Sequence, residues 1–190
     1  MNGTRRRSFL NIAALSMSGG RLLAQTSEPA TASKPALVSA GTDRQNKSHS
    51  VGVSATTYKV LTAETAGAMF VMEQANAKKG GPNRHLHFTQ DELFYVLEGD
   101  YIVEIGSERF HLRAGDCVLG PRQVPHAWAF VGQSTGRLLL TYSPAGKMEE
   151  FFNNRDQLGI AKGAYTSAKD ADTLRPYGMK YLGPPLKIDG

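Results

Sequence analysis

The stretch that decides the fold runs from residue 80 to residue 99 and reads GGPNRHLHFTQDELFYVLEG. It places three metal-type ligands close together, His85, His87 and Glu92, and a fourth, His126, follows after a gap marked by glycine and proline. Three imidazoles and one carboxylate can hold a divalent transition metal and leave coordination positions open for a substrate, water or dioxygen. The sequence therefore predicts a metal centre made of these four side chains.

The spacing of the four ligands sets geometric conditions. Side chains two residues apart on a strand point to the same face, so His85 and His87 can share one metal. Glu92 is an odd number of residues beyond His87 and would face away on an unbroken strand. We therefore expect a turn at residues 89–91 that brings the carboxylate back to the centre. His126 must come from a separate strand.

Apolar side chains are expected to line the same cavity as the metal. Phe94 and Val96 share the face of the carboxylate ligand, because they lie two and four residues further along the strand. Trp128 and Phe130 share the face of the last histidine for the same reason. The predicted substrate pocket is therefore a mainly apolar, aromatic-walled cavity with the metal near its mouth, which is typical of small-molecule sites.

Short stretches of strand character, separated by turn residues, fill the chain from residue 51 to residue 145. The expected strands are 58–62, 68–72, 92–97, 101–105, 109–112, 117–119, 127–131 and 137–142. Many short strands at close spacing are typical of an all-β sandwich or barrel.

The character of the chain changes in residues 146–190. Short helices are expected at 148–152 and 167–174, and the glycines and prolines between residues 176 and 185 are expected to prevent regular structure. We expect this helical tail to pack on the barrel or on a partner subunit.

The first 24 residues have the character of an export signal. They contain four arginines, no acidic residue, and a stretch that is too short and too polar to span a bilayer as a stable helix. Ala24 offers a small residue at a cleavage point. The segment Arg6-Arg7-Ser8-Phe9-Leu10 resembles a twin-arginine signal, which implies a disordered leader on a periplasmic or secreted protein.

The charge of the chain comes largely from this leader. The formal net charge is +5, but without the four leader arginines 18 basic residues face 17 acidic ones. No basic stripe interleaved with aromatics remains, so nucleic-acid binding is not expected. Residues 25–50 are expected to form a flexible linker in which His49 is solvated. The lone Cys117 lies in an apolar run and is expected to be a small buried side chain.

Two motifs carry a resemblance to a known family. The first consists of Gly80, His85, His87, Glu92 and Gly99, and the second, within GDCVLGPRQVPHAWAF at residues 115–130, consists of Gly115, Asp116, Pro121 and His126. Together they resemble the two motifs of the cupin superfamily. Gly80 is one residue nearer His85 than usual, Gln123 stands where glycine is common, and Phe130 stands where asparagine is common. The resemblance implies an all-β fold, a single jelly-roll barrel that holds a metal on the four ligands.

The resemblance also suggests a function, with alternatives. The single domain, the aromatic pocket and the export signal are most similar to quercetin-dioxygenase-type cupins. This implies a metal-dependent dioxygenase for a phenolic or enol-like small molecule, with Glu92 as the catalytic residue that takes the hydroxyl proton. The alternatives are a non-oxidative metal-dependent lyase, isomerase or decarboxylase, and a module that binds a metal or small molecule without turnover. Iron or manganese is favoured, while nickel, cobalt, copper and zinc also suit the ligands.

The strand that carries Phe94 is apolar on both faces. Tyr95 and Leu97 point away from Phe94, so a second sheet, the C-terminal tail or another subunit has to cover them. We expect a homodimer that acts on a small-molecule substrate, with no nucleic-acid partner and no integral membrane span.

Overall fold

The computed structural model describes residues 34–51, 54–155 and 173–188. By its internal contacts the chain separates into residues 1–30 and 31–190, and every described residue belongs to the second part. The predicted export signal and nearly all of the predicted helix at 167–174 lie outside the described residues. Within those described ranges, no helix is long and apolar enough to cross a membrane.

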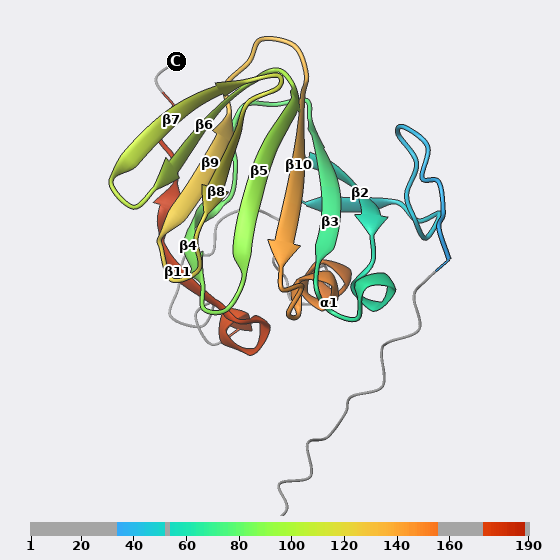
Figure 1. Cartoon of the computed structure of the whole chain (residues 1–190). Coiled ribbons are helices and arrows are strands. Elements are labelled where there is room, and N and C mark those ends of the chain that lie inside the picture. Colours follow the sequence, from blue (N-terminus) through green and yellow to red (C-terminus); the bar gives the residue numbers. More distant parts are fainter. Residues whose placement is uncertain (1–33, 52–53, 156–172, 189–190) are drawn as a thin grey trace, which may run out of the picture. The chain divides into compact units, whose positions relative to one another are not determined.

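Two antiparallel sheets form the fold (Figure 1). The six-stranded sheet contains, in spatial order, β1 (His49–Val51), β2 (Ser54–Val60), β3 (Phe70–Asn76), β10 (Gly136–Ser143), β5 (Asp91–Glu98) and β8 (Cys117–Gly120). The five-stranded sheet contains, in spatial order, β11 (Met179–Pro185), β4 (Asn83–His87), β9 (His126–Phe130), β6 (Asp100–Ile105) and β7 (Glu108–Arg113). The prediction of an all-β fold is confirmed.

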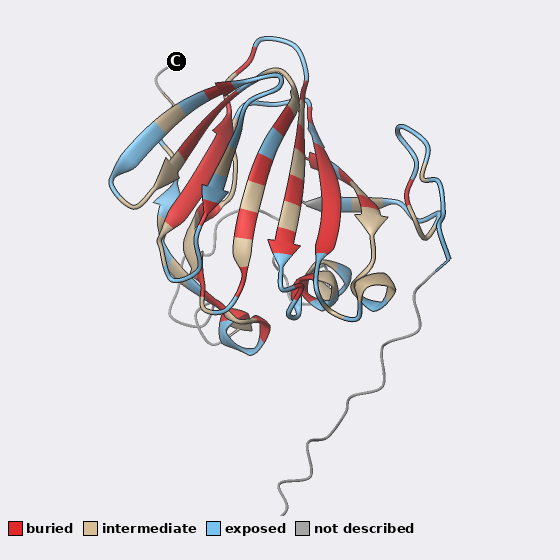
Figure 2. Cartoon of the chain, in the orientation of Figure 1, coloured by how far each residue is buried: buried red, intermediate tan, exposed pale blue. Residues whose placement is uncertain are grey.

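Alternation along the strands builds the core between the two sheets. On β10, Leu138, Leu140 and Tyr142 are buried while the residues between them are half-buried, and β5 shows a similar banding (Figure 2). In the antiparallel register, Leu138 lies opposite Val96, and Leu140 lies opposite Phe94. The inward side chains of the two strands therefore form one continuous apolar surface.

The helix predicted at residues 148–152 is confirmed as α1 (Met148–Asn154). It packs beside the barrel through its aromatic residues. The ring of Phe152 lies with its centroid 6.2 Å from that of Phe70 and 6.0 Å from that of Tyr142. Two 3-10 turns complete the described helical structure, η1 (Thr62–Thr65) and η3 (Arg175–Tyr177).

The expectation that residues 176–185 lack regular structure is wrong, because most of this stretch forms β11. The strand pairs antiparallel with β4, and the register shifts between Tyr181 and Gly183 and again between Gly183 and Pro185. β11 lies at the edge of its sheet, where proline is tolerated because one side of the strand needs no N–H donor. Glycine and proline therefore interrupt the ladder without abolishing the strand.

Part of the predicted linker at residues 25–50 packs on β2. The Asp43 carboxylate accepts hydrogen bonds from the backbone N–H groups of Tyr58 at 2.6 Å, Gln45 at 2.7 Å and Lys47 at 3.2 Å. The ring of His49 stacks on Tyr58 with centroids 4.0 Å apart, and its side chain is 13% exposed. The expectation that His49 is solvated is wrong, because its aromatic partner is supplied by the neighbouring strand. The boundaries of the predicted segments stay predictions.

The outer face of β8 also differs from expectation. Cys117 is exposed, and Leu119, two residues on, is 52% exposed. The expectation that Cys117 is buried is wrong because β8 is an edge strand. Side chains alternate along it, so Val118 turns inward while Cys117 and Leu119 turn outward. Tyr95, opposite Cys117 on β5, is 37% exposed.

Candidate metal centre

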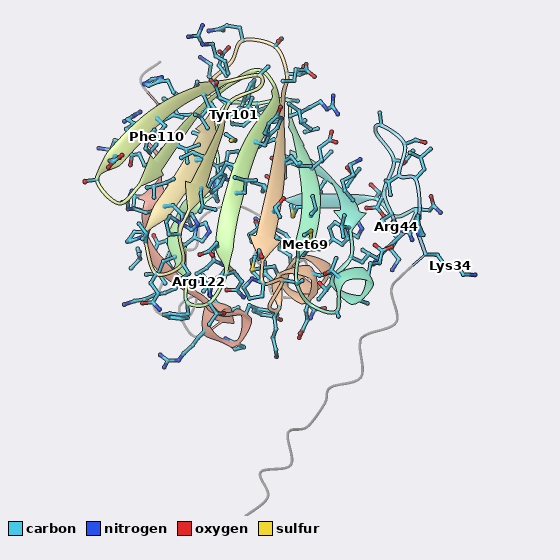
Figure 3. The ribbon with its side chains drawn as sticks, in the orientation of Figure 1. Lys34, Arg44, Met69, Tyr101, Phe110 and Arg122 are labelled. Carbon is cyan, nitrogen blue, oxygen red and sulfur yellow. The ribbon has the colours of Figure 1, made fainter. Side chains whose placement is uncertain are left out.

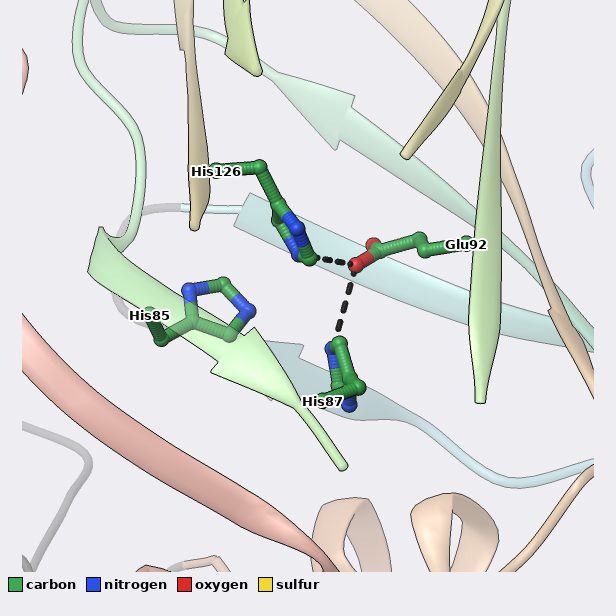
Figure 4. A group of neighbouring side chains, drawn as sticks. All are labelled: His85, His87, Glu92 and His126. Atoms are coloured by element: carbon green, nitrogen blue, oxygen red, sulfur yellow. Dashed lines mark hydrogen bonds and ion pairs between the residues drawn. The ribbon is translucent and has the colours of Figure 1, made fainter. Parts of the chain in front are cut away.

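The structure brings the four predicted ligands together between the two sheets (Figure 4). His85 and His87 extend from β4, Glu92 from β5 and His126 from β9. One ligand atom of each residue lies within 4.8 Å of the ligand atoms of the other three. The ring centroids of His85 and His126 are 4.7 Å apart, and those of His87 and His126 are 5.4 Å apart. The geometric condition set by the sequence is met.

A change of sheet explains how Glu92 turns inward. β4 ends at His87 and belongs to the five-stranded sheet, whereas β5 begins at Asp91 and belongs to the six-stranded sheet. The short connection therefore carries the chain across the barrel and reverses the facing of the next side chains, as the turn at residues 89–91 predicted. His126 opens β9 directly opposite His85 in the antiparallel register, so both side chains share one face.

An ion pair joins the two sequence motifs beside the centre. Asp91 accepts hydrogen bonds from Arg122 (Figure 3) at its backbone N (2.8 Å), Nε (3.0 Å) and Nη2 (2.7 Å). The guanidinium of Arg122 lowers the pKa of Asp91 to about 2. The contact ties the loop before β9 to the first residue of β5. It therefore links the elements that present His126 and Glu92.

The hydrogen bonds of the imidazoles test whether a cation fits the centre. Nδ1 of His85 lies 2.8 Å from the carbonyl oxygen of Asn83. Nδ1 of His126 lies 3.0 Å from the carbonyl oxygen of Val124. A carbonyl oxygen only accepts, so each Nδ1 carries a proton and Nε2 is the nitrogen that faces the centre. A backbone partner of this kind is also what orients the histidine ligands of metal sites.

The carboxylate completes this test. Oε2 of Glu92 lies 3.0 Å from Nε2 of His126 and 3.2 Å from Nε2 of His87. At His126 the lone pair of a neutral ring would face a carboxylate oxygen, and two acceptors at this distance need a proton or a metal ion beside them. The donor set therefore fits a divalent cation.

Electrostatics keep Glu92 ionised and His85 neutral. Burial alone would raise the pKa of Glu92, but protons on Nε2 of His126 and of His87, donated to the carboxylate, outweigh burial and leave the pKa below its ordinary value, and a cation in place of these protons acts in the same direction. Burial lowers the pKa of His85 to about 3, and the neighbouring histidines add to this effect. A neutral imidazole and an ionised carboxylate are the forms in which these side chains bind metals.

The four candidate ligands differ in exposure. His87 and His126 are 0% exposed and Glu92 is 2% exposed, whereas His85 is partly exposed. His85 is therefore the most exposed of the four.

Sequence reasoning missed Tyr142. It lies directly opposite Glu92 in the pairing of β10 with β5, is 3% exposed, and interacts electrostatically with the carboxylate. Burial, followed by the charge of Glu92, raises the pKa of Tyr142 well above its ordinary value, so the phenol keeps its proton. The alternation of Leu138, Leu140 and Tyr142 in the sequence identifies the face, but the partner across the strand pair is visible only in the fold.

The residues of the predicted substrate pocket are all buried. Phe94 contacts the metal cluster, with its ring centroid 5.8 Å from that of His126. Trp128 and Phe130 instead pack on Tyr101, at 5.8 Å and 5.4 Å between centroids. Val96 is 0% exposed within the same core. Phe94 is thus the member nearest the ligands, and the pocket role of all four stays a prediction.

The segment that holds the centre has a counterpart among known protein families. Residues 71–142 match the cupin domain family. The matched segment contains the four candidate ligands and Tyr142, whereas β11 lies beyond its end. The segment that matches the cupin domain family and the metal-type cluster therefore coincide in this chain.

Individual relatives of the cupin domain are distant. The uncharacterized protein MJ1618 of Methanocaldococcus jannaschii is 29% identical over 66 residues, which are 35% of this chain and 53% of that protein, so the chain spans about half the length of this relative. KdgF from Halomonas sp. is 18% identical, with a TM-score of 0.47, over 53% of this chain and 87% of that one. An RmlC-like cupin from Shewanella frigidimarina is 21% identical, with a TM-score of 0.46, over 54% and 87%.

Proposed function

We propose that this protein is a metal-dependent cupin enzyme, a dioxygenase that acts on a phenolic or enol-like small molecule. The observation that carries the proposal is the cluster of three imidazoles and one carboxylate, buried except at His85, which is partly exposed. Such a donor set holds a transition metal and leaves positions for other molecules. An apolar wall at Phe94, beside the ligands, suits an aromatic substrate.

The ligand residues have two roles in this proposal: all four bind the metal, and one of them also accepts a proton. His85, His87 and His126 would hold the metal together with Glu92. When bound, the metal supplies Lewis acidity that lowers the pKa of a substrate hydroxyl. Glu92 is the residue that would accept this proton, because its carboxylate is ionised, buried and positioned by hydrogen bonds.

The metal itself is testable by elemental analysis of the protein purified from its native compartment. We propose iron or manganese. Nitrogen and oxygen donors without a thiolate bind these ions, and the same donors also suit nickel, cobalt, copper and zinc. A protein that carries no stoichiometric transition metal and binds none on titration contradicts the metal centre.

Oxygen uptake by the full-length, metal-loaded protein tests the reaction. In a dioxygenase that cleaves its substrate, the substrate supplies the four electrons that reduce dioxygen and both oxygen atoms enter the products, so no external reductant is needed and uptake equals substrate consumed. We expect uptake with at least one of a flavonol, a catechol and a β-diketone, and its loss in Glu92→Gln. Tyr95→Phe, on the outer face of the same strand, is the matched control and should keep wild-type rates.

The alternatives give different results in the same assay. Product that forms equally without oxygen identifies a non-oxidative lyase, isomerase or decarboxylase. Tight binding with no product in any assay identifies a binding module. Absence of uptake with the whole panel refutes the dioxygenase.

We also propose export to the periplasm or beyond, and assembly as a homodimer. Export is supported by the twin-arginine resemblance at Arg6 and Arg7, and replacing both by lysine should retain the protein in the cytoplasm. The dimer is supported by the outer face of the six-stranded sheet, where Tyr95 and Leu119 are 37% and 52% exposed. Light scattering that shows only monomer at micromolar concentration contradicts it.

A further inference from the structure

The more exposed side of the metal centre, at His85, is bordered by the C-terminal strand. Because His85 is the one candidate ligand that is partly exposed, a small molecule approaches past it. β4, which carries His85, has two neighbours in its sheet: β9, which presents His126, and β11. In Figure 4 the red ribbon of β11 runs along β4 on the side of His85.

The register of β11 places two side chains on the inner face. Met179 lies directly opposite His87, and Tyr181 lies directly opposite His85. Opposed residues of an antiparallel pair point to the same face of the sheet, so both follow the histidines inward. The burial pattern agrees: Met179 is 3% exposed and Tyr181 is partly buried against the core, whereas Leu182 is 38% exposed.

The two inward side chains differ in what they can touch. Met179 lies beside a fully buried ligand and belongs to the core. Tyr181 lies beside the partly exposed ligand, and it is itself partly exposed. A half-buried phenol offers an apolar ring face and a hydrogen-bonding tip, which are the features that recognise a planar molecule with polar edges. The ladder also becomes irregular directly after Tyr181, so this side chain occupies the last regular position before the rim.

We propose that Tyr181 contacts the substrate and sets the specificity of the centre for planar aromatic or enolic anions. The inference rests on the proposed metal-dependent function and adds a specificity residue to it. Tyr181 lies beyond the segment that matches the cupin domain family, so the C-terminal tail of this chain contributes a wall of the site. The ring of Tyr181 stacks on the bound molecule, while His85 and the other ligands hold the metal.

Binding of nitrocatechol to the full-length, metal-loaded protein tests this assignment. Nitrocatechol is a planar phenolic anion whose visible absorption changes when it binds a metal, so its affinity is measured without turnover. The variants are Tyr181→Ala, which removes the ring, and Tyr181→Phe, which keeps it. Leu182→Ala is the matched control, since it shortens the next side chain of the same strand on the outer face.

We expect Tyr181→Ala to bind nitrocatechol about tenfold more weakly or worse, because an aromatic contact at a partly buried site is of this size. Tyr181→Phe should stay within about threefold of the wild type, and Leu182→Ala should be unchanged. Metal content and metal affinity should be the same in all four proteins. If Tyr181 had only a structural role, its replacement by alanine would lower both.

The failures of the two proposals are distinguishable. A wild-type protein that binds no metal overturns the proposed function. Wild-type protein that binds metal but not nitrocatechol overturns the assigned ligand class. Equal nitrocatechol affinity in wild type and Tyr181→Ala, an equal loss in Leu182→Ala, or loss of metal in Tyr181→Ala overturns the role of Tyr181.

Discussion

Replacing Tyr142 by phenylalanine should weaken metal binding about 10- to 100-fold while leaving the barrel folded. The change deletes the phenol oxygen, which interacts with the Glu92 carboxylate at a site that is 3% exposed. Water cannot replace the lost donor there without entering the core. Glu92 keeps its contacts with His87 and His126, so it stays near the centre but loses one restraint.

The magnitude follows from the charge of the acceptor. A hydrogen-bond donor that faces an ionised acceptor contributes up to about 1.5–3 kcal/mol. Since about 1.4 kcal/mol corresponds to a factor of ten in an equilibrium constant, this range agrees with the loss seen when residues that position metal ligands are removed. The free energy of unfolding of the metal-free protein should fall by a similar amount.

Zinc titration with a competing chelator measures the affinity, and Tyr101→Phe is the control. Tyr101 is 1% exposed, its oxygen accepts a hydrogen bond from Nδ2 of Asn76 at 2.7 Å, and it lies toward the end of the barrel away from Arg122 in Figure 3. The same atom is removed from an equally buried tyrosine, so stability should fall while zinc affinity stays unchanged. Wild-type affinity in Tyr142→Phe, or an equal loss in both variants, refutes the reasoning.

Three further predictions concern the ligands and the fold. His126→Ala should reduce metal occupancy sharply in elemental analysis, and full occupancy would show that the centre is placed wrongly. The metal-free protein should lose up to about 2 kcal/mol of stability between about pH 7.5 and about pH 5 in denaturant titrations. The sign follows because the pKa of His85 is lowered from 6.5 to about 3, so only the unfolded chain gains this proton in that range. Stability that rises on acidification contradicts it. Gly81→Ala should destabilise the fold by about 1–3 kcal/mol or more in thermal unfolding, because its new methyl group would lie 1.8 Å from the backbone oxygen of Trp128. Gly183→Ala, whose nearest contact is at 4.0 Å, should be nearly neutral, and equal losses in both would argue against the clash.

Much of the fold could be predicted from local patterns. Alternating apolar residues at 92–97 and 137–142 identified two central strands, and the odd spacing of Glu92 from His87 required the turn between sheets. The outer faces were harder to predict. Cys117 reads as buried in an apolar run, but whether a strand lies at an edge depends on pairing with distant segments.

The C-terminal strand could not be predicted from local sequence either. Gly183 and the prolines after it argue against regular structure when only local preferences are considered. β11 forms nevertheless, because β4 offers it an open edge with unpaired backbone groups. The pairing places Tyr181 beside His85, which no spacing in the sequence indicates.

The amino-acid order alone determined the donor types, their spacing and the alternating faces, because a side chain's chemistry and its direction on a strand are local properties. Tertiary structure alone decided which residues lie together across strand pairs: Tyr142 with Glu92, Tyr181 with His85, and His49 with Tyr58. The physical reason is that strand pairing joins residues far apart in the chain, and its register is selected by the packing of the whole core rather than by any short segment.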